Sequence, residues 1–182
     1  MMTSNNLGQV QVFWGDGKGK TTAALGCALR ACGSGLSVHL IQFMKNGAKN
    51  LKEQMPGEIK ALSKFKNFSY KRFGLGEWYA KDKNYVSHRK KIQEALSYLK
   101  SCFGKYDIII ADEILYAVQL ELLDEQEVVF LIKEKPGSQE LILTGSHKQF
   151  ENIFAAADLV TEVKKHKHPY DSGIMAKKGI EY

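Results

Sequence analysis

The sequence predicts a single α/β domain with a mainly parallel sheet and helices on both faces. Three observations predict it: strand-like and helix-like segments alternate, the most apolar strands lack polar alternation, and a glycine-rich loop joins the first strand to the first helix. Continuous apolar runs are typical of parallel strands that are covered on both faces. The length suits one domain over residues 1–182, with residues 1–8 expected to be flexible.

The first half of the chain is expected to contain three strands and two helices. Residues 9–14 (QVQVFW) are rich in β-favouring side chains, whereas the segment from Lys20 to Ala31 has Leu25 and Leu29 four residues apart and is expected to be helical. Two glycines soon after this segment predict its end. The expected strands are 9–14, 37–43 and 68–73, and the expected helices are 20–31 and 58–65.

The second half alternates in the same way. The helix expected over 85–102 carries an apolar stripe at helical spacing, and its other side is basic. That stripe consists of Ile92, Ala95, Leu96 and Leu99. Asp124 is expected to cap a later helix, because acidic residues follow it in the first turn. The expected strands are 106–113 and 140–145, and the expected helices are 85–102, 124–135 and 149–157.

Composition and charge narrow the classes of function. No apolar run approaches the roughly 20 residues of a membrane span, and the N-terminus, MMTSNNLGQ, does not read as a secretory signal. A cytoplasmic protein without a membrane partner is therefore expected. Three cysteines without CxxC spacing argue against a disulfide framework or a zinc site. The net charge of +6 points to anionic ligands, such as nucleotides, phosphorylated small molecules or nucleic acid.

The loop GDGKGKTT, where the first strand should turn into the first helix, is a candidate phosphate site. Glycines let backbone N–H groups approach phosphate oxygens, and the helix N-terminus adds partial positive charge. Lys20 can reach a phosphate oxygen, and the Thr21 hydroxyl is placed to ligate Mg²⁺. The usual GxxxxGK[ST] pattern would put its first glycine at Trp14, so the match is imperfect. The expected binding residues are Gly15, Asp16, Gly17, Lys18, Gly19, Lys20, Thr21 and Thr22.

Two carboxylates at the end of strand 106–113 complete the expected site. Asp112 or Glu113 can hold a metal ion directly or through water, so these two residues and Thr21 are the expected ligands of Mg²⁺ or Mn²⁺. A hydrolase would commonly also need an arginine at the transition state. The only arginines are Arg30, Arg72 and Arg89, and neither Arg30 nor Arg89 is in an obvious position for that role. This disfavours routine hydrolysis.

With these residues identified, the chain resembles the ATP:corrinoid adenosyltransferases of the P-loop type over nearly its whole length. The loop alone would be weak support, because P-loops are widespread; the acidic strand and the tail make the likeness specific. The segments that carry the resemblance are GDGKGKTTAALG (15–26), IQFMKNG (41–47), NLKE (50–53), GEWYAKDKN (76–84), YDIIIADEILYAVQLELLDEQEVV (106–129), LILTG (141–145), ADLVTEV (157–163) and KHPYDSGIMAKKGIEY (167–182).

The resemblance implies a P-loop NTPase-like (RecA-like) fold and a transferase. The 5′-carbon of ATP would be joined to the reduced cobalt of cob(I)alamin or cobyrinic acid a,c-diamide, and the intact triphosphate would leave. ATP would lie reversed relative to ordinary P-loop enzymes. Lys20, Thr21 and Glu113 would be catalytic, and Trp78 would form a wall of the corrin pocket. For partners, the resemblance implies a homodimer and a flavoprotein electron donor.

The chain departs from the family pattern at two places. Gly76 stands where relatives often have an aromatic residue, so Phe73 or Tyr79 could take that part. Ser146 stands where relatives have an arginine; His147 or Lys148 is the nearest cationic candidate.

Two other classes of function remain as alternatives. The first is a RecA-like ATPase that makes ADP and phosphate. The second is a nucleotide- or nucleic-acid-binding module, although no aromatic–basic stacking motif supports a nucleic-acid partner.

Overall fold

The structure of the chain, a computed structural model, describes residues 7–45, 55–75 and 79–180. Gly8 is already held by the fold, because its N–H donates to the Glu140 carboxylate and its carbonyl accepts from Lys135. The flexibility expected for residues 1–8 therefore does not extend to Gly8. No helix within the described ranges is long and apolar enough to cross a membrane.

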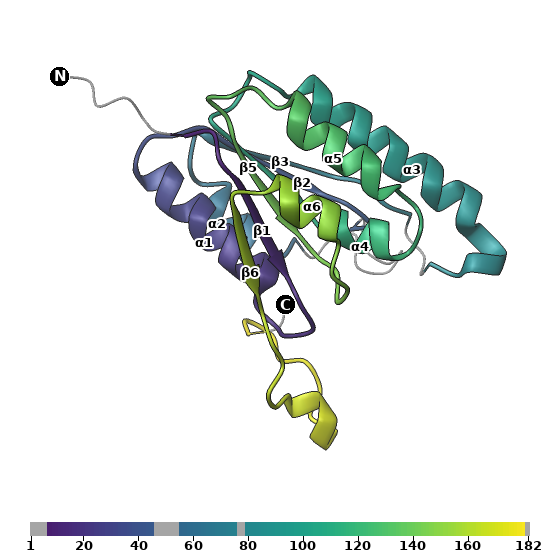
Figure 1. Cartoon of the computed structure of the whole chain (residues 1–182). Helices are drawn as coiled ribbons and strands as arrows, with labels where there is room; N and C mark the ends of the chain where they lie inside the picture. Colours follow the sequence, from purple (N-terminus) through teal and green to yellow (C-terminus); the bar gives the residue numbers. More distant parts are fainter. Residues whose placement is uncertain (1–6, 46–54, 76–78, 181–182) are drawn as a thin grey trace.

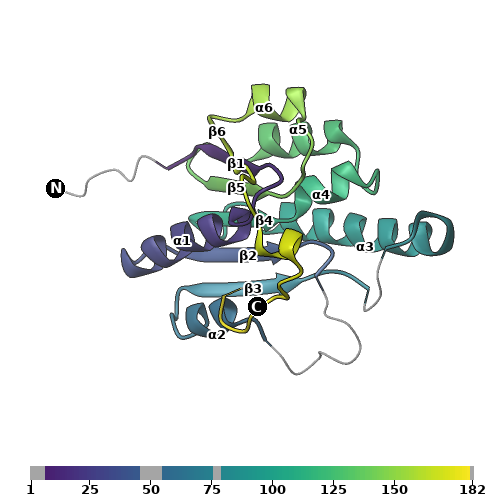
Figure 2. The same ribbon diagram turned by 90° about the horizontal axis from the view of Figure 1, so that it is seen from below.

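The core of the fold is a six-stranded sheet in which every pairing is parallel (Figure 1). The strand order is β3-β2-β4-β5-β1-β6, and Figure 2 shows β3 and β6 at opposite edges. The candidate phosphate site GDGKGKTT (15–22) is called the phosphate loop below. The strand that leads into it, β1, is separated by β5 from β4, which ends in Asp112. The strands are β1 (Val10–Trp14), β2 (Val38–Gln42), β3 (Phe68–Arg72), β4 (Ile108–Asp112), β5 (Glu140–Thr144) and β6 (Leu159–Glu162).

Helices cover both faces of this sheet. Helices α1 and α2 lie on one side and the remaining α-helices on the other (Figure 1). Each face has its own buried cluster, one with the apolar residues of α1 and α2, the other with those of α3, α4, α5 and α6. The helices are α1 (Lys20–Gly33), α2 (Gly57–Leu62), α3 (Lys81–Ser101), α4 (Ile114–Gln119), α5 (Glu125–Glu134), α6 (Glu151–Ala156) and the short 3₁₀ helix η2 (Pro169–Ser172).

The expected α/β class with a parallel sheet is confirmed, and the architecture is consistent with a P-loop NTPase-like fold. Asp124 caps α5 in a reciprocal capping box with Glu127. The apolar stripe on α3 is buried as expected. Two details differ. Helix α4, directly after Asp112-Glu113, was not expected, and Leu29 is 53% exposed, because α1 buries Ala24, Leu25, Ala28, Ala31 and Cys32 instead.

The carboxyl ends of all six strands point to one edge of the sheet, because all pairings are parallel. The phosphate loop and both candidate carboxylates follow strands that end there. After β6 the chain leaves the body of the domain and carries η2 outward, as Figure 1 shows in yellow. This edge is therefore where a site built on the phosphate loop must lie.

Candidate functional site

The phosphate loop starts directly after β1 and leads into α1. Gly15 and Gly19 have φ angles of 113° and 127°, in the left-handed region that residues with side chains rarely adopt. Trp14, at the position of the missing first glycine, is the last residue of β1 and packs on Phe154 with ring centroids 5.1 Å apart. A core residue of the strand therefore fills the first position of the usual pattern.

Gly15 and Gly17 fasten the loop to neighbouring backbone. The Gly15 N–H donates to the carbonyl of Ser146 (2.9 Å), and the Gly17 N–H donates to the carbonyl of Val163 (2.7 Å). A Cβ atom at Gly17 would lie 2.7 Å from that same Val163 oxygen, and one at Gly15 would lie 2.4 Å from it. Both glycines permit close backbone approach. Gly17 was expected to supply an N–H to phosphate, but that N–H is already engaged.

The first turn of α1 offers the donors that Gly17 does not. First-turn N–H groups have no intrahelical carbonyl to bond, and Gly19, which precedes the helix, brings no capping side chain. The helix itself therefore gives the N–H groups of Lys20, Thr21 and Thr22 no carbonyl partner, and its N-terminus favours negative charge there. The side chains of Lys18 and Thr22 are exposed beside this turn.

Lys20 lies over the loop with its ammonium group directed back at it. Nζ donates to the carbonyls of Gly15 (2.6 Å) and Gly17 (2.9 Å). Burial lowers the pKa of Lys20, while the negative charges of Glu113 and Asp16 act in the opposite direction. The ammonium is thus held at the mouth of the loop by neutral carbonyls, which a phosphate oxygen can replace with a charge-assisted bond.

Asp112 is fully buried and lies at the centre of a hydrogen-bond network. Its Oδ1 accepts from the hydroxyls of Thr21 (2.8 Å) and Thr144 (2.7 Å), and its Oδ2 accepts from Nε2 of Gln42 (2.9 Å). The structure therefore brings Thr21 and Asp112 together, as the sequence predicted. Gln42 and Thr144 were not singled out as site residues, although both end strands that neighbour β4.

Glu113 differs from its neighbour in conformation and in partners. Its backbone is left-handed (φ 65°), and its N–H donates to the Thr144 hydroxyl at 3.0 Å. Its carboxylate is partly exposed and pairs with Nζ of Lys45 at 3.3 Å. Its charge also raises the pKa of Lys20 against the effect of burial. Glu113 thus faces the open side of the site, whereas Asp112 is enclosed.

The oxygen atoms of this centre fit a hard divalent cation. Thr21 and Asp112 supply hydroxyl and carboxylate oxygens, the kind of ligand that Mg²⁺ prefers. Within the described ranges, no three His, Cys, Asp or Glu side chains cluster as a metal cage. Mg²⁺ usually keeps several waters and binds through one or two protein groups together with substrate phosphates. The residues present fit that mode of binding.

The segment that follows β6 braces the outer side of the phosphate loop. The Val163 N–H donates to the carbonyl of Trp14 (2.8 Å), and the Lys165 N–H donates to Oδ1 of Asp16 (2.9 Å). The Lys165 hydrogen bond lowers the pKa of Asp16. Asp16 therefore ties the loop to the start of the C-terminal segment. No pattern in the sequence predicted this contact, which joins residues far apart in the chain.

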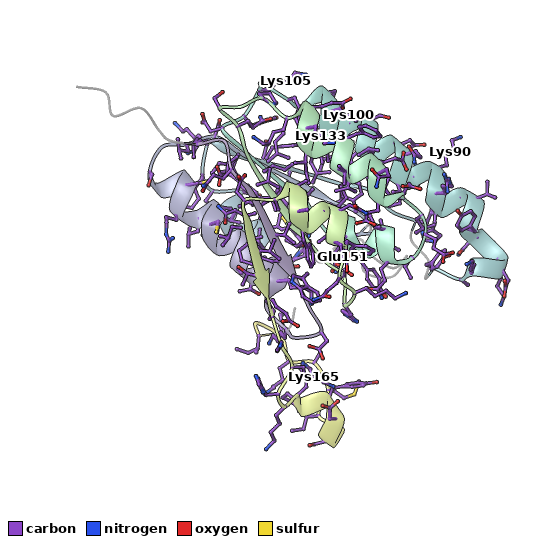
Figure 3. The ribbon with its side chains drawn as sticks, in the orientation of Figure 1. Lys90, Lys100, Lys105, Lys133, Glu151 and Lys165 are labelled. Carbon is purple, nitrogen blue, oxygen red and sulfur yellow. The ribbon has the colours of Figure 1, made fainter. Side chains whose placement is uncertain are left out.

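An open pocket of about 600 Å³ lies against this braced side of the loop. His147 and Lys148 both line it, with Lys165, whose side chain projects from the segment after β6 (Figure 3). Ser146 itself is buried, and its hydroxyl donates to the carbonyl of Lys148 at 2.8 Å. Other residues that line the pocket are Trp14, Gly15, Asp16, Gln149, Glu162, Lys164 and His166.

The expected corrin contacts are only partly within the described residues. Trp78 and Gly76 lie outside the described ranges. Phe73 and Tyr79, the candidate replacements for the missing aromatic residue, are partly buried against the cluster beneath α3. The Phe73 ring packs against the Tyr98 ring, with ring centroids 5.4 Å apart, so Phe73 already contacts the core.

Comparisons with known proteins show the family of the chain. The family model described as "ATP:corrinoid adenosyltransferase BtuR/CobO/CobP" matches residues 6–182. A corrinoid adenosyltransferase of Escherichia coli K12 is 34% identical over 181 residues, covering 96% of this chain and 86% of the relative. The corrinoid adenosyltransferase CobA of Salmonella typhimurium is 34% identical with the same coverage, and one from Sinorhizobium sp. is 32% identical, covering 98% and 82%. The chain belongs to the ATP:corrinoid adenosyltransferase family.

Proposed function

We propose that this protein transfers the 5′-deoxyadenosyl group of ATP to the Co(I) centre of a reduced corrinoid. The cobalt electron pair attacks C5′, a cobalt–carbon bond forms, and the bond from C5′ to oxygen breaks. That electron pair leaves with the triphosphate, and cobalt is formally oxidised from Co(I) to Co(III). Membership of the family supports the reaction. The observation that carries it is the phosphate grip formed by Lys20, the first turn of α1 and the Thr21–Asp112 pair.

The grip stabilises charge on the leaving group and needs no general base. Cob(I)alamin is itself a strong nucleophile, so catalysis requires alignment of cobalt with C5′ and stabilisation of the departing triphosphate. Lys20 would exchange its two carbonyl partners for phosphate oxygens, and Thr21 with Asp112 would hold Mg²⁺ or Mn²⁺. That ion, when bound, neutralises phosphate charge. Glu113 would keep Lys45 and Lys20 placed at the open side.

An ATPase fits the arginines less well. Arg30 is exposed on α1, and Arg89 is exposed on α3, where it donates to the Tyr85 hydroxyl at 2.8 Å. Arg72 is the last residue of the edge strand β3. Strands β2, β4 and β5 lie between β3 and β1, the strand that leads into the phosphate loop. None of the three is adjacent to the phosphate loop in the chain or in the sheet. Hydrolysis of the terminal phosphate commonly uses such an arginine.

A nucleic-acid-binding module is also less well supported. Of the lysines labelled in Figure 3, Lys90, Lys100, Lys105 and Lys133 gather around α3 and α5, whereas Lys165 lies on the segment after β6 beside the phosphate loop. Lys100 there is paired with Glu134 at 2.7 Å, so part of the charge is neutralised within the protein. A nucleic-acid footprint would be a continuous, unpaired basic face.

We also propose the corrinoid acceptor, the electron donor and the oligomeric state, by analogy with the family. Cob(I)alamin or cobyrinic acid a,c-diamide is the acceptor, a flavoprotein supplies electrons for the reduction of cobalt, and two copies of the chain form a homodimer. The proposed role of Trp78 is to form one wall of the corrin pocket. A Trp78→Ala variant is then expected to impair reduction of cob(II)alamin more than transfer to prereduced cob(I)alamin. Equal effects on both steps would contradict that role.

An anaerobic assay tests the proposal. Purified protein is given ATP, Mg²⁺ and chemically reduced cob(I)alamin, and the adenosylcobalamin spectrum is followed together with the phosphate products. We expect triphosphate to form only when the reduced corrinoid is present. ADP and phosphate formed without corrinoid, in the absence of any cobalt–carbon product, would favour the ATPase instead.

A further inference from the structure

Three polar side chains form a row across the carboxyl end of the sheet. Gln42 on β2 is paired in register with Asp112 on β4 and with Arg72 on β3. Paired residues of parallel strands point to the same face, which here is the face of α1 and α2. The row therefore runs outward from the carboxylate that holds Thr21, past Gln42, to Arg72 at the sheet edge.

Among the residues that the structure describes, only one of the two ends of the Gln42 amide has a hydrogen-bond partner. Nε2 must face Asp112, because the Asp112 carboxylate can only accept the 2.9 Å hydrogen bond. This fixes the orientation of the amide and leaves Oε1 as the other end. Oε1 is buried and accepts no hydrogen bond from any residue that the structure describes, although Gln42 is only 4% exposed.

Arg72 has a donor without a partner, which complements the acceptor of Gln42. Its Nε–H is buried and finds no acceptor in the described part of the chain. An unpaired buried donor or acceptor destabilises a fold by roughly 1–3 kcal/mol, and such groups are rare in native proteins. Within the described ranges, an acceptor and a donor without partners thus lie at paired positions of adjacent strands, whose backbones are about 4.8 Å apart. They indicate a place for a group that can satisfy both.

A water molecule or a ligand group that fills this place must donate to Gln42 and accept from Arg72. Phosphate and carboxylate oxygens only accept, so the triphosphate does not supply the missing proton donor. A carboxamide presents N–H and C=O on neighbouring atoms and can face both residues at once. A corrinoid carries carboxamides around its edge, and the row extends away from the phosphate grip.

We propose that Gln42 and Arg72 bind a peripheral carboxamide of the corrinoid and make the enzyme favour amidated corrinoids over those with a free carboxylate at that position. This inference rests on the proposed function. A carboxylate there would still accept from Arg72, but it would place two acceptors against each other at Gln42 Oε1. It would also add negative charge close to Asp112.

The test compares Arg72→Met with Lys71→Met, which removes a cation from the same strand on the opposite face, where Lys71 lies over Tyr98. Initial rates are measured with cob(I)alamin and with cob(I)alamin monocarboxylates, in which one peripheral amide is hydrolysed. For Arg72→Met we expect the corrinoid KM to rise about tenfold, equivalent to one hydrogen-bonded contact. The KM for ATP should stay within about twofold.

The monocarboxylates provide the decisive comparison. For one regioisomer, we expect the unmodified protein to lose about tenfold in kcat/KM, while Arg72→Met loses much less, because the contact is already gone. Lys71→Met should discriminate as the unmodified protein does. Arg72→Lys, which keeps the charge but not the Nε donor, should behave like Arg72→Met and serves if the methionine variant does not fold.

Three results would overturn the inference. The first is that no regioisomer is discriminated by the unmodified protein. The second is that Lys71→Met has the same effect as Arg72→Met. The third is that Arg72→Met raises the KM for ATP but not for the corrinoid, and that 2′-deoxy- or 3′-deoxy-ATP reproduces the loss, which would assign the contact to a ribose hydroxyl. A protein that transfers no adenosyl group at all would refute the proposed function instead.

Discussion

Charged side chains are buried in different ways where the strands of the sheet begin, which we call the amino edge, and where they end, which we call the carboxyl edge. At the amino edge, Lys135 Nζ donates to three carbonyls, those of Gly8 (2.7 Å), Gln139 (2.8 Å) and Pro136 (3.1 Å). Glu140 accepts from the N–H groups of Gly8 and Gln9 and from Nε2 of Gln11. These charges therefore fasten the N-terminal segment to β5 and α5, and their partners all belong to the fold.

At the carboxyl edge, the comparable lysine has a different setting. Burial lowers the pKa of Lys20, as it does that of Lys135. Lys20, however, lies beside first-turn N–H groups and the Thr21–Asp112 pair, where an anion can join it. A perturbed lysine pKa alone thus does not distinguish a site from a structural clamp. The chemistry of the neighbouring groups makes the distinction.

The largest expected effect is at Lys20. Lys20→Ala should lower kcat/KM for adenosyl transfer by about 10³-fold or more, since it removes a cation from the developing charge of the leaving triphosphate. The free energy of unfolding should fall by about 1–3 kcal/mol, because the carbonyls of Gly15 and Gly17, both buried residues, lose their donor. Anaerobic rates and denaturant unfolding measure both quantities.

Lys133→Ala on the outer face of α5 provides the matched control, and it should change neither quantity. Near-normal turnover of Lys20→Ala would contradict the role assigned to the loop.

A smaller loss is expected from Asp112, and it separates the two adjacent carboxylates. Asp112→Asn should reduce kcat by about 10²-fold, because the Thr21 hydroxyl loses a charged acceptor and Mg²⁺ loses a negative charge nearby. Glu113→Gln should lose less than about tenfold, since that carboxylate is partly exposed and pairs with Lys45. Titration of rate against Mg²⁺ should show weaker apparent affinity for Asp112→Asn. The reverse order of effects would make Glu113 the metal residue.

The amino edge should respond in stability and not in catalysis. Lys135→Met leaves the carbonyls of Gly8, Pro136 and Gln139 without their donor and should lower the free energy of unfolding by about 2–3 kcal/mol. Well below the unfolding temperature, kcat/KM should stay within twofold. Urea unfolding and initial rates measure the two effects. A large loss of activity in the folded variant would remove the contrast between the two edges.

The smallest effect concerns His39, which is buried beneath α3. Its ring stacks on Tyr106, and its nitrogens bond Ser69 and Tyr98. Burial, with the positive charge of Lys71, lowers the pKa of His39 to about 4. The unfolded chain, with a pKa near 6.5, therefore binds the proton first. Stability is complete above pH 6.5 and falls as the pH drops toward 4, by about 1–2 kcal/mol.

Denaturant unfolding at pH 7 and at pH 4.5 measures this loss. His39→Gln should remove most of the difference between the two pH values, although it lowers stability at both. An unchanged pH dependence in that variant would assign the loss to other groups.

The sequence predicted the parts of the site that are local. Strand, glycine loop and helix are contiguous, so Lys20 and Thr21 could be placed, and Asp112 follows from the end of an apolar strand. The functions of Gln42 and Arg72 depend on which strands are neighbours and in what register, and single-sequence patterns do not encode either. The brace from Lys165 to Asp16 likewise joins residues 149 positions apart.

Helix α4 was missed for a different reason. Its six residues are nearly all apolar and follow a buried strand directly, so no helical period separates them from the strand. The turn between the two elements depends on the left-handed conformation of Glu113, and glutamate is not a residue that normally predicts such a turn.

The central claim is that the triphosphate leaves intact while C5′ is attacked. It is tested most directly by replacing ATP with its β,γ-imido analogue, whose terminal phosphate resists hydrolysis, in the anaerobic reaction with cob(I)alamin. Since no bond between phosphates is broken in the proposed reaction, adenosylcobalamin should form at a rate within about tenfold of that with ATP. Absence of the cobalt–carbon product with the analogue, while ATP itself yields ADP and phosphate, would contradict the account.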